Sequence, residues 1–142
     1  MRRRRLMVTG LVCGLLLLPG CAKVGEEEEA AEGAATVEEV AGSDVPRVIL
    51  TPDAEERIDV QSAEVATAGG ATEIPYAAVF YTAEGDTWTY TSPEPHVFVR
   101  VPIAIDRIDG DQVFLSDGPP AGTAVVTLGS AELFGTETGV EE

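Results

Sequence analysis

The chain contains few of the residues that catalytic and metal sites use most often. Its 142 residues include two cysteines, Cys13 and Cys21, and a single histidine, His96. Beyond Cys21 there is no thiol for a disulfide, a thiolate metal site or a cysteine nucleophile. No serine stands in a Gly-x-Ser-x-Gly motif, and we expect His96 to be an exposed strand-end residue. The sequence predicts neither an enzyme nor a bound cofactor.

Basic residues are also scarce. The sequence has 9 Lys and Arg against 25 Asp and Glu, a formal net charge of −16. Four of the arginines lie at positions 2–5, so the chain after residue 20 keeps 5 basic residues and a formal charge of −20. This charge repels phosphate backbones and anionic lipid headgroups. It argues against nucleic acid as a partner and against membrane attachment through a basic patch.

The first 21 residues have the pattern of an export signal. A basic start at residues 2–5 precedes an apolar run, residues 6–18, that is too short to span a bilayer. The tetrapeptide Leu18-Pro19-Gly20-Cys21 resembles the lipobox of bacterial lipoproteins. This resemblance implies a diacylglycerol on the Cys21 thiol and a protein held at the extracytoplasmic face of the cell membrane. An ordinary cleaved signal is the alternative, and both the Sec and the twin-arginine export routes stay open.

Composition divides the remaining chain into two parts. Residues 21–44 are rich in Glu, Ala and Gly, contain no aromatic residue and include a run of four glutamates. Low hydrophobicity and like charge cannot offset the ordering entropy, so we predict a lipidated, disordered acidic tether. Residues 45–142 are predicted to form one β-rich domain, and residues 1–20 form the signal peptide.

Residues 97–129 carry the clearest strand pattern. Apolar residues at alternate positions from 97 to 105 are typical of one half-buried strand. Asp109-Gly110 favours a tight hairpin turn, and apolar runs at residues 113–115 and 124–128 predict two further strands.

The preceding segment adds one helix and more strands. A short helix is predicted over residues 52–58, because Thr51 can cap its start and Pro52 suits the first helical position. The chain must turn at Gly69-Gly70, and strands are predicted over residues 74–81 and 87–91. The predicted fold is mainly β, a small antiparallel barrel or sandwich with one short helix.

The order of these motifs resembles the C-terminal part of the periplasmic adaptor subunits of efflux pumps, the membrane fusion protein family. A strand that begins near Pro75 leads to the acidic hairpin 84–86, followed by an aromatic strand with Trp88 and Tyr90 and then by a longer strand. The family's glycine and valine motif is matched by Gly118, Ala121-Gly122, Val125-Val126 and Gly129. The resemblance covers roughly residues 47–139 and implies the membrane-proximal β-domain of that family.

The chain lacks two parts of such adaptors. The family inserts a lipoyl-like domain and a long helical hairpin where this chain has only a few residues, between positions 65 and 74. The resemblance therefore implies that the segments before and after this point join in one sheet, without the usual conduit.

These observations predict a non-enzymatic interaction module, anchored to the membrane through Cys21, that meets a transporter permease or another envelope protein. The candidate partner contacts are acids at two hairpin tips, Glu84, Asp86, Asp109 and Asp111. Solvated turns are the simpler interpretation of either tip. A solute- or cation-binding surface lipoprotein is the alternative function. Asp106 and Asp117 could join the second tip around calcium, although the spacing is not that of an EF-hand.

Overall fold

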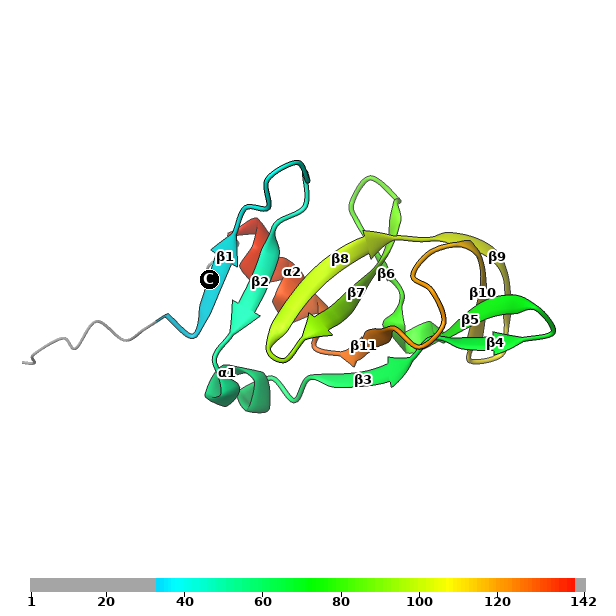
Figure 1. Ribbon diagram of the computed structural model, residues 1–142, viewed down its shortest axis with the longest axis horizontal. Helices are drawn as coiled ribbons and strands as arrows, with labels where there is room; N and C mark the ends of the chain where they lie inside the picture. The colour runs from blue at the N-terminus through cyan, green and yellow to red at the C-terminus, as the bar shows by residue number, and fades with distance from the viewer. Residues whose placement is uncertain (1–32, 140–142) are drawn as a thin grey trace, which may run out of the picture.

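The computed structural model describes residues 33–139 and is mainly β and antiparallel, as predicted (Figure 1). The larger sheet has the strand order β1-β2-β8-β7-β11-β3, with β6 paired to β7. It is built from β1 (Ala35–Glu38), β2 (Arg47–Leu50), β3 (Gln61–Glu64), β6 (Phe80–Tyr81), β7 (Thr87–Glu94), β8 (Val97–Pro102) and β11 (Ala124–Leu128).

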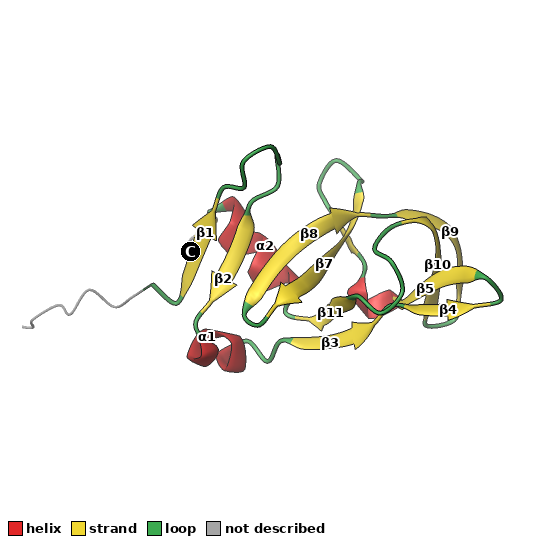
Figure 2. Cartoon of the chain, in the orientation of Figure 1, coloured by secondary structure: helices red, strands yellow, loops and turns green. Residues whose placement is uncertain are grey.

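The smaller sheet has the order β4-β5-β10-β9 and lies beyond one end of the larger sheet (Figure 2). Its strands are β4 (Ala66–Ala68), β5 (Ala71–Pro75), β9 (Ala104–Asp109) and β10 (Gln112–Asp117). The two sheets do not close into a barrel, so that form of the prediction is wrong. The chain passes from one sheet to the other before either sheet can complete a ring.

The folded part begins earlier than predicted. β1 pairs with β2 from Ala35↔Leu50 to Glu38↔Arg47, and the Thr51 amide donates to the Ala34 carbonyl over 3.0 Å. The prediction of a disordered tether is therefore wrong for residues 35–38, which gain order by pairing with the next strand of the chain, β2. Residues 21–32 of the predicted tether lie outside the described residues.

Two α-helices flank the larger sheet. α1 (Pro52–Arg57) confirms the predicted short helix, and the Thr51 hydroxyl accepts a hydrogen bond from the Ala54 amide over 3.2 Å. α2 (Ser130–Thr138) was not predicted, and it packs against β1 and β2. Thr136 and Thr138 donate hydrogen bonds to carbonyls four residues earlier, a pattern that slightly disfavours a helix, so α2 depends on its packing.

Two of the predicted strands are broken. The pattern over residues 97–105 divides into β8 and β9 at Ile103, where the Ile103 amide and carbonyl both bond to Thr87. The run over residues 74–81 divides into β5, the 3₁₀ helix η1 (Tyr76–Ala78) and β6. At each break the chain leaves one sheet and enters the other.

The turn at Gly69-Gly70 is confirmed as a two-residue hairpin between β4 and β5. Both glycines have positive φ, 61° and 85°, as a tight hairpin of this length favours. The predicted joining of the segments before position 65 and after position 74 is also confirmed. β2 pairs with β8, and β3 pairs with β11, all within the larger sheet.

Residues 33–139 contain two hydrophobic cores, and β11 contributes to both. The aromatic core contains Val48, Leu50, Ala54, Tyr90, Phe98, Val126 and Leu133. The aliphatic core contains Val65, Ile74, Ala78, Ile103, Val113, Leu115 and Val125. Successive residues of a strand point to opposite faces, so Val125 enters one core and Val126 the other.

Candidate functional site

The lipidation site predicted at Cys21 lies outside the described residues, as does the export signal. Within residues 33–139, no helix is long and apolar enough to cross a membrane. The described structure therefore bears on the candidate contacts of the β-domain.

The first candidate tip is the loop over residues 82–86, between β6 and β7. Glu84 and Asp86 are exposed there, and the loop is closed by hydrogen bonds between the backbones of Thr82 and Asp86, 3.0 Å, and of Gly85 and Thr82, 3.0 Å. The two carboxylates are thus displayed on a short, internally bonded loop.

The second candidate tip is the turn between β9 and β10. Asp109 pairs with Gln112 across the turn, and Gly110 has a φ of 60°. Asp109 and Asp111 are both exposed. Figure 2 shows this turn and the 82–86 loop at opposite sides of the view, so the four acids do not gather into one cluster.

Two exposed tyrosines lie near the tips, and they were not predicted as contact residues. Tyr76 is 45% exposed, and its amide donates to the Asp111 carbonyl over 2.8 Å. Tyr81 is 52% exposed and pairs with Thr87 at the base of the 82–86 loop. Tyr76 therefore adjoins one tip and Tyr81 adjoins the other.

The Tyr76 side chain also affects the pKa of Tyr81. A hydrogen-bonding interaction with the Tyr76 side chain raises the pKa of Tyr81, with smaller contributions from burial and from the charge that Tyr76 can carry. The shift favours the neutral hydroxyl of Tyr81.

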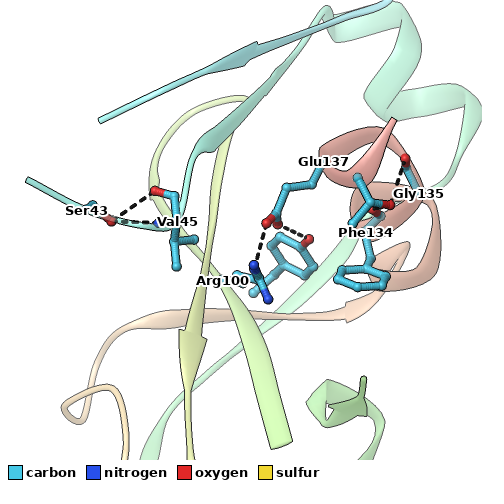
Figure 3. Close-up of polar contacts among 8 residues, drawn as sticks. Ser43, Val45, Arg100, Phe134, Gly135 and Glu137 are labelled. Atoms are coloured by element: carbon cyan, nitrogen blue, oxygen red, sulfur yellow. Dashed lines mark hydrogen bonds and ion pairs between the residues drawn. The ribbon is translucent and has the colours of Figure 1, made fainter. Parts of the chain in front are cut away.

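A second polar cluster is buried beneath α2. Figure 3 shows Glu137, in the last turn of α2, directed at Arg100 of β8 beside Phe134. Arg100 Nε donates to Glu137 Oε1 over 2.6 Å, and the Tyr90 hydroxyl donates to Glu137 Oε2 over 2.6 Å. The Glu137 side chain is only 3% exposed. Both carboxylate oxygens are therefore satisfied by the sheet.

Aromatic rings surround this ion pair. The Arg100 guanidinium carbon lies 4.4 Å from the centre of the Trp88 ring and 5.8 Å from that of Phe134. Burial and then the hydrogen bond to Glu137 raise the pKa of Tyr90 well above its ordinary value. Tyr90 is fully buried in the aromatic core, and Trp88 is half-buried beside it. The cluster holds α2 on the larger sheet and offers no exposed reactive group.

Comparisons with known proteins give no relatives. The chain matches no protein-family model, no curated protein and no solved structure. The function must therefore be argued from the chain's own residues.

His96 occupies the turn between β7 and β8 with a φ of 63°. Its Nδ1 lies 2.5 Å from Glu55 Oε2 of α1, and its side chain is 42% exposed. The residue as a whole is half-buried, so the prediction of an exposed residue is only partly correct, and the sequence did not reveal its partner Glu55. A surface hollow of about 240 Å³ adjoins it, with Glu56 and Asp59 on its wall.

The described region contains no preformed set of metal ligands. Across residues 33–139, no three His, Cys, Asp or Glu side chains are placed to hold one metal ion. Asp106 was a possible calcium ligand at the second tip. Its Oδ2 atom instead lies 3.2 Å from Arg107 Nη1. The acids of this tip remain as solvent-facing charges.

Proposed function

We propose that the protein is a non-enzymatic interaction module held at the extracytoplasmic face of the cell membrane by a lipid on Cys21. It serves as an adaptor that meets a transporter permease or another envelope protein. The lipobox-like sequence before Cys21 supports the anchor, and the acidic surface supports a protein partner.

The observation that carries the adaptor role is the way in which two chain segments share one sheet. β2 and β3 precede residues 65–74, which form β4 and most of β5, whereas β7, β8 and β11 follow them. β2 pairs with β8 and β3 pairs with β11, so the sheet is complete without any inserted domain. This is the arrangement that the resemblance to efflux adaptors implies for a domain that has no lipoyl insertion.

The anchor is tested by metabolic labelling with a palmitate analogue. The wild-type chain should take up the label and remain in the membrane fraction. Cys21→Ala should lose the label and partition into the medium. A Cys13→Ala variant is the matched control, since this thiol lies inside the signal and should not affect labelling. A wild-type protein without label would refute the anchor.

The adaptor role is tested by crosslinking in intact cells, followed by mass spectrometry. Recovery of a transporter permease or another envelope protein is expected. Calorimetric titration with calcium and with zinc addresses the alternative, a cation-binding lipoprotein. Saturable micromolar binding of either ion, without a recovered membrane protein, would replace the adaptor role with that alternative.

A further inference from the structure

Residues 61–68 form the outermost strand of each sheet in turn. β3 ends the larger sheet, beside β11, and β4 ends the smaller sheet, beside β5. Only Val65 separates these two strands along the chain, and Figure 1 shows one following the other. Each strand has a hydrogen-bonded neighbour on one side only, among the residues that the structure describes. We call residues 61–68 the β3–β4 edge.

The backbone of the β3–β4 edge is fixed by its inner neighbours. Val65 is buried in the aliphatic core, its amide donates to the Thr123 carbonyl over 2.8 Å, and its carbonyl accepts from the Gly122 amide over 2.9 Å. The register with β11 is unbroken from Glu64 to Ser62. Successive residues of an antiparallel strand direct their amides and carbonyls to opposite sides, so Glu64 and Ser62 direct theirs away from β11. The edge thus presents hydrogen-bonding groups on a backbone that is already ordered, which lowers the entropy cost of binding.

The β3–β4 edge lacks the protection that the edge strand β9 has. Three of the six residues of β9 are charged, and its register with β10 shifts at two places. Charged side chains and bulges are the devices by which natural edge strands avoid unwanted pairing. The β3–β4 edge has eight residues, of which five are exposed, and it contains no proline and one charged residue, Glu64. It is therefore open to an added strand.

Charge favours a partner protein over a second copy of this chain as that added strand. Asp59 precedes the edge, Glu64 lies within it, and Glu73 of β5 is opposite Ala66. No Lys or Arg occurs in residues 58–99. Two copies, each with a formal charge of −20 after residue 20, repel each other, whereas a basic segment is attracted.

We propose that the β3–β4 edge binds an extended, basic segment of the partner protein as an additional β-strand. This proposal rests on the proposed function and adds the surface, the mode of binding and the partner's chemistry. In strand addition of this kind, hydrogen bonds between the main chains supply affinity, and the alternate side chains supply specificity.

The test uses the full chain in neutral detergent micelles and a fluorescent peptide of alternating lysine and threonine. The lysines complement the acids around the edge, and threonine favours an extended strand. Binding is measured by fluorescence anisotropy at fixed ionic strength. The control peptide has the same sequence with every backbone nitrogen methylated, so it keeps its charge and its side chains but cannot donate main-chain hydrogen bonds.

We expect the methylated peptide to bind at least about tenfold more weakly than the unmethylated peptide. On the protein, Ser62→Pro removes an outward amide and leaves the bonds to β11 in place, so it should weaken binding by about tenfold. The matched control is Val37→Pro in β1, at the opposite edge of the same sheet. The Thr51 amide donates to the Ala34 carbonyl, so the same alternation directs the Val37 amide outward. This control should change binding by less than about twofold.

Hydrogen exchange locates the bound peptide on the protein. The amides of residues 61–68 should exchange more slowly when the peptide is bound, whereas exchange at residues 35–38 should not change. Circular dichroism shows whether each variant is folded. The comparison of the two peptides uses the wild-type chain, so it decides the question even if Ser62→Pro does not fold.

Equal binding of the two peptides would show that charge alone attracts them, and would overturn the proposal. Unchanged binding by a folded Ser62→Pro variant would overturn it as well. A wild-type dimer that Ser62→Pro abolishes would assign the edge to a second copy of the chain instead.

Crosslinking in intact cells separates this inference from the proposed function. If an envelope partner is recovered equally with Ser62→Pro and with the wild-type chain, the adaptor role stands and the edge is rejected as its contact. If the unmethylated peptide binds the edge and no envelope partner is recovered, the binding surface stands and the adaptor role is rejected.

Discussion

The two cores of this small domain are built from different chemistry. The aliphatic core consists of Val, Ile, Leu and Ala side chains between the two sheets. The aromatic core adds Tyr90 and Phe98, and borders an ion pair between Arg100 and Glu137. One strand, β11, supplies Val125 to the first and Val126 to the second. The comparison indicates that the aliphatic core depends on close packing alone, whereas the aromatic core also depends on the buried ion pair and its hydrogen bonds.

Removing the Glu137 carboxylate, which borders the aromatic core, should cause the largest loss of stability. Glu137→Ala leaves the half-buried Arg100 guanidinium and the Tyr90 hydroxyl without their acceptor, and should lower the free energy of unfolding by about 3 kcal/mol. Urea unfolding measures the change. Glu132→Ala, at an exposed position of the same helix, should cost about 0.5 kcal/mol or less.

A double variant tests the physical reason. Arg100→Met combined with Glu137→Ala removes the uncompensated charge, so it should be more stable than Glu137→Ala alone. A double variant less stable than the single one would show that Arg100 acts through its packing on Trp88 and not through its charge.

Substitutions on the shared strand ask whether the cores unfold together. Val125 and Val126 have no exposed surface, and each change to Ala should cost about 2 kcal/mol. Trp88, the single tryptophan, lies beside the aromatic core and reports on it by fluorescence. We expect both variants to shift the fluorescence and circular dichroism transitions equally. A Val125→Ala variant whose fluorescence transition stays in place would show that the cores unfold independently.

Alanine substitutions at two glycines, one before α2 and one within it, should change the stability in opposite directions. Gly129 has a φ of 97°, and an added Cβ would lie 3.1 Å from Val60 Cγ2, so Gly129→Ala should cost about 1–2 kcal/mol. Gly135 lies within the helix with open space around it, so Gly135→Ala should stabilise by up to about 1 kcal/mol. Thermal unfolding distinguishes them, and destabilisation by both would mean that α2 tolerates no added side chain.

The smallest effect is a pH dependence specific to the aromatic core. Folding raises the pKa of Tyr90 above its ordinary value of 10.0, so its contribution to stability is complete below pH 10 and declines above it. The free energy of unfolding should fall above pH 10 by at most about 1.4 kcal/mol per pH unit from this group. Tyr90→Phe should reduce that slope, and an unchanged slope would assign the loss to other residues.

Sequence reasoning predicted the features that depend on local chemistry. Gly69-Gly70 and Asp109-Gly110 mark real turns, Thr51 caps a real helix, and the antiparallel β class is correct. β1 could not be predicted, because its polar sequence gains order only by pairing with β2. The ion pair joins residues 37 positions apart, and no local pattern indicates such a contact. The exposure of Tyr76 and Tyr81 was hidden for the same reason, since their segment has the composition of a buried strand.

The position of β1 limits how far the domain can stand from the bilayer if Cys21 carries a lipid. Residues 21–32 are the whole connection between that cysteine and the described fold, and twelve residues span at most about 40 Å in any conformation. β1 lies at one end of the molecule and the β4–β5 hairpin at the other (Figure 1). The protein would then act as a short-range probe of the membrane surface, able to meet partners that project little from the bilayer.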